Sequence, residues 1–342
     1  YVSADVEALK EARYSYFKNM PKCKNKKYES LYYKALSVQK VSVHTPEGKI
    51  PCMWTTPDRV PHRHMWLWDS VFHAMAFLTY NKEMAENCIN SVLSQICEDG
   101  FMPHMMNPVD SSDVTQPQVL AWGTWEVCKK TGNRKFLEEC APKLDKYLTW
   151  DMENRDKNGN GLLEWLTEPD YSTSPEAMAC KCGESGIDNS PRFDFDDDMD
   201  AIDFSVWAAR DALYLSYIYN ELGDKENAVN SYYKCAEINP DYEYGYIGAG
   251  VMFYNMAIEI LDKAQNEFDD AKYNALLNQC EEVLTKALDP FEKAFNVTKD
   301  ETLKVNIAEY LKNIYYRFQT KGEKYEEGYK KYDEIVKTGV VK

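Results

Sequence analysis

The sequence predicts an all-α protein built from antiparallel helical hairpins, and two observations carry this prediction. Apolar residues recur at the 3.6-residue period of a helix over most of the 342 residues, and the first such face joins Val6, Leu9, Ala12 and Phe17. Strand patterns are sparse, and breaks that contain glycine or proline divide the helical segments from one another. Successive helices separated in this way are typical of helical hairpins.

After this first helical face, the next elements in chain order are one strand candidate and two helices. The alternating run Leu36–Val43 leads into a turn at His44–Gly48 and predicts a short hairpin. Helices are then expected over Trp66–Tyr80 and over Met84–Cys97, and Gly100 closes the second of them.

A third helix is expected to open at Thr115–Pro117 and to end before Gly132, and a long segment follows over Lys135–Arg155. The run Asp156–Gly161 then breaks the helix. Its aspartate and asparagines alternate as in the opening of a calcium-binding loop, but the twelfth position is Thr167, where such loops place a glutamate. We therefore expect a plain turn here.

The last third of the chain has a different texture. After a helix expected over Asp203–Leu222 and capped by Gly223, the offsets of a tetratricopeptide repeat (TPR) recur: a small residue, an aromatic four positions on, and a further residue three positions on. The separations are irregular, and any packed helical hairpin can produce so short a pattern. We expect TPR-like hairpins over residues 223–342, whose groove would suit a protein partner. The three occurrences are Ala228–Tyr232–Cys235, Ala287–Phe291–Ala294 and Gly328–Tyr332–Ile335.

The composition excludes several classes of function. A formal net charge of -16 would repel a phosphate backbone, so we expect no nucleic-acid partner. No uninterrupted apolar run reaches the length of a membrane span, so we expect no membrane association. The 25 tyrosines, 13 phenylalanines and 8 tryptophans supply flat faces that stack on sugars or fill a core.

Cysteines and histidines give no framework for a metal site. The ten cysteines lack zinc spacing, which favours free thiols in a reducing compartment. His62, His64 and His104 have no acidic or cysteine partner at ligand spacing, so we expect structural hydrogen bonding and neither a metal nor another cofactor. The first residues, Tyr1–Asp5, show no features of a signal peptide, and we expect a cytoplasmic protein.

A carboxylate-bearing loop over Gly183–Asp194 is the leading candidate site. It places Glu184 and Asp188 among small turn-forming residues whose backbone can approach a ligand, and Pro191 prevents a helix from running through it. Taken alone, this composition also fits an ordinary surface turn. The surrounding motifs decide between the two interpretations.

Six motifs in the first two thirds of the chain occur in a recognisable order. They are Trp54–Arg59, Arg63–His73, Gly100–His104, Thr115–Pro117, Asn160–Trp165 and Glu184–Phe193. Together these motifs resemble the six-hairpin glycosidases, specifically glycoside hydrolase family 63 and its mannosylglycerate-hydrolase-like relatives, over about residues 27–222.

The resemblance implies an (α/α)6-toroid-like arrangement in the first part of the chain and inverting hydrolysis of an α-linked glucoside or mannoside. On the family pattern Asp188 is the general acid. Inversion requires a second carboxylate about 6.5–9.5 Å away, which leaves room for the attacking water. Asp188 would need a raised pKa to be protonated at neutral pH; the nearby charge of Glu184 would raise that pKa, and Arg192 would oppose the shift.

Other motif residues suit a sugar pocket. On a helix, Trp66, Asp69 and His73 share one face, where the indole would stack on a sugar ring and the carboxylate would accept hydrogen bonds from its hydroxyl groups. Alternatively, Trp66 fills the core, and Asp69 pairs with His73 or caps the helix. Further substrate-binding residues are expected at Trp68, Gln116, Trp122, Glu164, Trp165, Glu184 and Arg192.

The resemblance ends near Leu222. The family's catalytic base is a glutamate in the later half of the toroid, and no counterpart is identifiable beyond this point. We therefore expect a glycosidase-like toroid portion over residues 1–222, followed by a TPR-like region over residues 223–342. Three functions stay open: a hydrolase acting on an oligosaccharide or small glycoside, a helical scaffold for a protein partner, and a sugar-binding protein that lacks the base.

Overall fold

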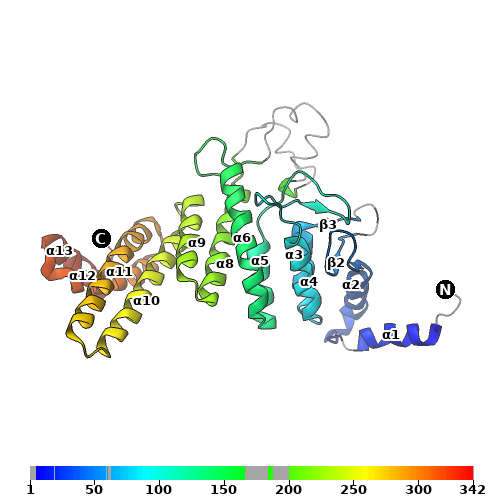
Figure 1. The fold of residues 1–342 in the computed structure, drawn as a ribbon, viewed down its shortest axis with the longest axis horizontal. Helices are drawn as coiled ribbons and strands as arrows, with labels where there is room; N and C mark the ends of the chain where they lie inside the picture. The colour runs from blue at the N-terminus through cyan, green and yellow to red at the C-terminus, as the bar shows by residue number, and fades with distance from the viewer. Residues whose placement is uncertain are drawn as a thin grey trace. The chain divides into compact units, whose positions relative to one another are not determined.

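The computed structural model describes residues 5–18, 20–58, 60, 63–165, 184–187 and 200–341. Regular structure in these residues is almost entirely helical, which confirms the all-α prediction (Figure 1). The chain forms two compact units: unit 1 comprises residues 1–147 and 168–195, and unit 2 comprises residues 148–167 and 196–342. The domain boundary predicted at Leu222 stays a prediction.

Helices α3, α4 and α5 of unit 1 pack against one another. Gly123 of α5 allows a close approach, because a Cβ at this position would lie 2.5 Å from Cγ1 of Val71 on α3. The helices described in unit 1 are α1 (Val6–Lys18), α2 (Glu29–Val41), α3 (Leu67–Phe77), α4 (Lys82–Leu93) and α5 (Leu120–Thr131), with a 3-10 turn at Lys26–Tyr28, while α6 (Arg134–Asn154) begins in unit 1 and ends in unit 2.

Helix ends in unit 1 follow local chemistry where the sequence signals were specific. The side chain of Asn81 caps α4 by accepting a hydrogen bond from the backbone N–H of Met84 (3.1 Å). Gly132 ends α5 with a left-handed φ of 73°, as predicted. Helix α5 begins at Leu120 and not at Thr115, because the preceding residues are buried and bonded to other parts of unit 1.

Antiparallel two-stranded pairings accompany these helices in unit 1. β1 (Val43–His44) pairs with β2 (Trp54–Thr55), and β3 (Met65–Trp66) pairs with β4 (Met105–Met106). The second pairing places Trp66, which precedes α3, opposite Met105 of β4.

The strand predicted over Leu36–Val43 is wrong for most of its length, because α2 continues to Val41 and only Val43 is in a strand. Leu36 is buried, whereas Val38 is 46% exposed. In a strand these two residues would share one face, so their different burial is consistent with the helix. The short hairpin expected after this run does form, between β1 and β2.

Helical hairpins make up most of the described part of unit 2, in which α8 packs on α9, α10 on α11 and α12 on α13 (Figure 1). Aspartate side chains cap α9, α11 and α12 at their N-termini, and Gly223 ends α8 with a left-handed φ of 80°, as predicted. The helices are α8 (Ile202–Leu222), α9 (Lys225–Ile238), α10 (Glu243–Gln265), α11 (Asp270–Val297), α12 (Glu301–Phe318) and α13 (Glu323–Thr338), with a 3-10 turn at Gln319–Lys321.

The residues at the predicted TPR offsets lie in the second helix of each hairpin and, apart from Gly328, are buried. The rings of Tyr232 and Phe291 pack against glycines of α10. A Cβ on Gly248 would lie 2.0 Å from the ring of Tyr232, and one on Gly250 would lie 2.9 Å from the ring of Phe291. The spacing found in the sequence therefore marks helix–helix contacts.

The Asp156–Gly161 turn is held by its own side chains. The carboxylate of Asp156 accepts hydrogen bonds from the backbone N–H groups of Asn160 (3.1 Å) and Gly161 (3.0 Å), and the side chain of Asn158 donates to Asp200 (3.1 Å). In the described part of the chain, no group of three or more His, Cys, Asp or Glu side chains is arranged to hold a metal ion. His62 and Thr167 lie outside the described residues.

No helix among the described residues is both long and apolar enough to cross a membrane. The cysteines that the structure describes form no disulfide with one another.

Candidate active site

Three motifs that are far apart in the sequence meet in unit 1. The backbone N–H of Thr115 donates a hydrogen bond to Oε1 of Glu184 (3.2 Å), and the backbone N–H of Trp68 donates to Oε1 of Gln116 (3.2 Å). Gly186 completes the group, because its backbone lies against the indole of Trp68. The start of α3, residues 115–116 and residues 184–187 therefore form one connected site.

Residues 115–118, here called the strap, form the centre of this site. Thr115, Gln116 and Gln118 are at most 2% exposed. Tyr147 of α6 anchors the strap, because its hydroxyl donates to the carbonyl of Gln116 (2.8 Å) and lies 2.6 Å from Oγ1 of Thr115. Tyr147 was not predicted as a site residue, since no motif surrounds it in the sequence.

Residues 184–187 form a tight turn. Glu184 is fully buried and Ser185 is 1% exposed, whereas Ile187 is 43% exposed. Oγ of Ser185 accepts a hydrogen bond from the backbone N–H of Ile187 (3.0 Å), and Gly186 has a left-handed φ of 66°. The predicted residues Asp188 and Arg192 lie outside the described residues.

Trp66 and Asp69 flank the start of α3. Trp66 is half-buried, and its ring meets the imidazole of His104 edge to face, at 5.0 Å between centroids and 79° between planes. His104 directly precedes β4, and its Nδ1 lies 2.6 Å from Oγ of Ser112 in the loop after β4, which fixes the imidazole against this loop. Asp69 is half-buried in the first turn of α3.

His73 contacts β2 and α2. Its Nδ1 lies 2.9 Å from Oγ1 of Thr55, and its carbonyl accepts a hydrogen bond from the side chain of Gln39 (3.1 Å). Burial lowers the pKa of His73 to about 4, so the imidazole is neutral near pH 7. These contacts hold His73 between secondary-structure elements.

An aromatic row extends from the site along α3. Trp68 and Phe72 have ring centroids 5.9 Å apart, and Phe72 and Trp122 of α5 have centroids 6.3 Å apart. Phe72 is 43% exposed, although it was not among the predicted site residues. Its position one helical turn after Trp68 is the signal that could have identified it.

Glu164 and Trp165 belong to unit 2 and are almost fully buried there, at 7% and 3% exposure. Oε2 of Glu164 accepts a hydrogen bond from the backbone N–H of Lys157 (3.3 Å). The ring of Trp165 stacks on Phe204, at 4.6 Å between centroids and 9° between planes.

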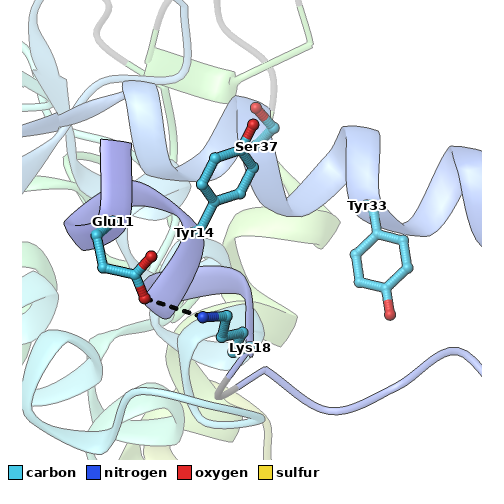
Figure 2. A pocket seen from close by; sticks show the side chains of 5 residues that line it. All are labelled: Glu11, Tyr14, Lys18, Tyr33 and Ser37. Carbon is cyan, nitrogen blue, oxygen red and sulfur yellow. Dashed lines mark hydrogen bonds and ion pairs between the residues drawn. The ribbon is translucent and has the colours of Figure 1, made fainter. Parts of the chain in front are cut away.

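Two cavities lie beside α2. One, of about 680 Å³, lies between α1 and α2, where Tyr14 and Tyr33 project from the two helices and an ion pair of 2.9 Å joins Glu11 to Lys18 (Figure 2). The other, of about 540 Å³, has mainly apolar walls from α2 and α3 and is lined in part by His73. Of the predicted site residues that the structure describes, only His73 lines either cavity.

Comparisons with known proteins give a matching family and several relatives. The family described as "Mannosylglycerate hydrolase MGH1-like glycoside hydrolase domain" matches residues 62–297. Mannosylglycerate hydrolase MGH2 of Selaginella moellendorffii is 23% identical over 164 residues, which cover 41% of this chain and 31% of the relative. Glucosylglycerate hydrolase of Mycolicibacterium hassiacum is 25% identical over 178 residues, which cover 41% of this chain and 36% of the relative.

The chain thus spans about a third of the length of these curated relatives. Among solved structures, GH63 mannosylglycerate hydrolase from Thermus thermophilus in complex with glucose aligns with a TM-score of 0.46 and 20% identity, covering 64% of this chain and 62% of that chain.

Proposed function

Because this chain belongs to the mannosylglycerate hydrolase MGH1-like glycoside hydrolase family, we propose that it hydrolyses an α-linked glucoside or mannoside with inversion, using Asp188 as general acid. One observation supports the proposal above the others. Hydrogen bonds join the strap both to Trp68 and to Glu184, so three of the motifs that carry the family resemblance form one site. Core packing alone does not require this convergence.

The proposed substrate is a glycoside of glycerate. The names of the relatives, a mannosylglycerate hydrolase and a glucosylglycerate hydrolase, supply this idea. Such a substrate joins a neutral sugar to a small carboxylic acid, and the glycerate would leave as the alcohol after protonation of the glycosidic oxygen by Asp188.

In the proposed mechanism, a second carboxylate activates water on the face of the sugar opposite to Asp188. We assign no residue to that base. Trp66 and Asp69 are proposed to hold the sugar ring by stacking and by hydrogen bonds to its hydroxyl groups. Substrate contacts by His73, Trp122, Arg192, Glu164 and Trp165 stay proposals of the same kind.

Sugar binding without hydrolysis is the second candidate function. Inversion needs two carboxylates, and a matching motif identifies only Asp188. A protein partner for residues 223–342 is a third possibility, favoured by exposed aromatic side chains such as Phe268 (98%) and Tyr316 (58%).

The test is the release of sugar from α-glucosylglycerate, α-mannosylglycerate and aryl α-glycosides. We expect hydrolysis of at least one of the two glycerate glycosides, a first product of inverted anomeric configuration by NMR, and a loss of about 10²–10⁴-fold in Asp188→Asn. Failure of the wild type on the whole panel would overturn the hydrolase. Sugar affinity in calorimetry that is lost in Asp69→Ala would then support the binding function, and no affinity at all would leave the scaffold.

A further inference from the structure

The backbone of Gly186 lies against the indole of Trp68, although the two residues are far apart in the sequence. A Cβ on Gly186 would lie 2.2 Å from Cη2 and 2.3 Å from Cζ2 of the indole. The backbone of the turn therefore rests on the benzene half of the ring. Only glycine fits, for two separate reasons: the ring leaves no space, and φ is left-handed at 66°.

Trp68 is itself fixed, which makes it a firm support. Its backbone N–H is bonded to Gln116 in the strap, and its ring lies beside that of Phe72. The strap is in turn bonded to Tyr147, whose side chain is fully buried. The ring beneath Gly186 is thus anchored to the packed core of unit 1 and is not a loose surface side chain.

A second tether holds the same turn from its other end. The carboxylate of Glu184 is fully buried and accepts the hydrogen bond from the backbone N–H of Thr115. Because the side chain of Glu184 is fully buried, it cannot contact a sugar without a rearrangement of the site. The bond from Thr115 to Glu184 and the indole of Trp68 instead hold residues 184–186 from two directions.

Asp188 follows Gly186 by two residues, so covalent geometry keeps their Cα atoms within about 7 Å of each other. A general acid must lie within hydrogen-bond reach of the oxygen that it protonates, and a displacement of about 1 Å can cost about 10²-fold in rate. Loss of the support that Trp68 and Glu184 give to the turn should consequently lower the rate of any reaction in which Asp188 takes part.

We propose that Trp68 and Glu184 are positioning residues, which hold the Ser185–Gly186 turn and act on catalysis through it, and that Trp68 is not a sugar-stacking platform. This inference rests on the proposed role of Asp188. Stacking would make Trp68 contribute to sugar affinity, whereas positioning makes it contribute to the rate of the bound complex.

The first experiment separates rate from affinity in Trp68→Phe, which removes the ring atoms beneath Gly186 and keeps an aromatic side chain. We expect kcat to fall about 10–100-fold. The substrate Kd, measured by calorimetry in the Asp188→Asn background, should change less than about twofold, because positioning acts on the bound complex. An increase in Kd as large as the loss in kcat would overturn positioning and would establish stacking.

The second experiment is a double-mutant cycle between Gly186→Ala and Trp68→Phe, read by hydrogen exchange of the amides of residues 184–187 in the full chain. Gly186→Ala should speed exchange at least about tenfold more in the wild-type background than in the Trp68→Phe background. The reason is that the added methyl group overlaps the indole of the wild type, and this overlap is absent when Trp68 is replaced by phenylalanine. Independent effects of the two substitutions would overturn the packing. Gly132→Ala is the matched control, since Gly132 has a left-handed φ of 73° but no atom within 4 Å of its added methyl.

Glu184 is tested in the same exchange assay. Glu184→Gln keeps an acceptor for the N–H of Thr115 and should leave exchange in the turn nearly unchanged, whereas Glu184→Ala should accelerate it. Equal effects of the two variants would overturn the tether. Because exchange does not depend on turnover, a chain without hydrolysis but with coupled exchange would overturn the proposed function and would still establish how the turn is held.

Discussion

The lowered pKa of His73 predicts how the stability of this protein changes with pH. Its pKa is lowered by burial to about 4, whereas a histidine in an unfolded chain has a pKa of about 6.5. Above about pH 6.5 both states carry a neutral imidazole, and the contribution of His73 to stability is complete. As the pH falls below this value, the unfolded state binds a proton that the native state excludes, so stability is lost progressively down to about pH 4.

The size of this loss of stability follows from the difference between the pKa of His73 in the folded and in the unfolded state. Each pH unit within this window changes the free energy of unfolding by about 1.4 kcal/mol. The loss is therefore about 2 kcal/mol between about pH 7 and pH 5 and about 3 kcal/mol over the whole window. A typical domain is stable by about 5–15 kcal/mol, so this single side chain should be visible in an equilibrium measurement.

The assay is urea denaturation of the wild type and His73→Gln between about pH 7.5 and pH 4.5, which brackets the titration of the unfolded state. Glutamine does not titrate and can still form a hydrogen bond with Thr55. The free energy of unfolding of the wild type, relative to that of the variant, should therefore decrease as the pH falls, with the predicted slope. Thr55→Val is the control, because it removes the partner at 2.9 Å but keeps the imidazole and hence most of the slope. A difference between wild type and His73→Gln that does not change with pH would refute burial as the cause.

Three further predictions concern packing. Gly123→Ala should lower the free energy of unfolding by about 1–3 kcal/mol in thermal denaturation, since its methyl group would overlap Val71, and Val71→Ala in the same chain should recover most of the loss. Gly248→Ala should lower Tm through overlap with the ring of Tyr232, and an unchanged Tm would contradict the close contact between α9 and α10. Tyr147→Phe should cost about 1–3 kcal/mol in urea denaturation, because it removes the hydroxyl that anchors the strap; a variant as stable as the wild type would show that this hydroxyl is not an anchor.

Sequence patterns predicted those parts of the fold that local chemistry determines. The ends of α5 and α8 were predictable because the left-handed backbone at Gly132 and Gly223 favours glycine whatever surrounds it. The run Leu36–Val43 was mispredicted because a short apolar segment fits both periods, and burial against the rest of unit 1 decides between them. The TPR offsets identified buried residues such as Tyr232, but not the glycines on the neighbouring helix that accommodate the rings.

The candidate site was predictable as a set of motifs but not as a geometry. The motifs contain Trp68, Gln116 and Glu184, yet nothing in their spacing shows that the bonds between them run from backbone N–H groups to side-chain oxygens. Full burial of Glu184 could not be read from a stretch whose composition also suits a surface turn. Tyr147 was missed because its only signal is a long-range contact.

This bonding pattern separates residues that shape the site from residues that contact a ligand. Glu184 and Gln116 each use a side-chain oxygen to accept a hydrogen bond from the backbone of a different motif, so these oxygens determine the shape of the site before any ligand arrives. Breaking the bond to Glu184 would leave the buried N–H group of Thr115 without its acceptor, which is costly in a water-poor interior. The turn that leads to Asp188 is thereby supported by the same interactions that stabilise unit 1. Glu184→Ala and Trp68→Phe should consequently lower stability and reaction rate together, whereas substitution of a residue that only contacts the sugar should lower affinity and leave stability unchanged.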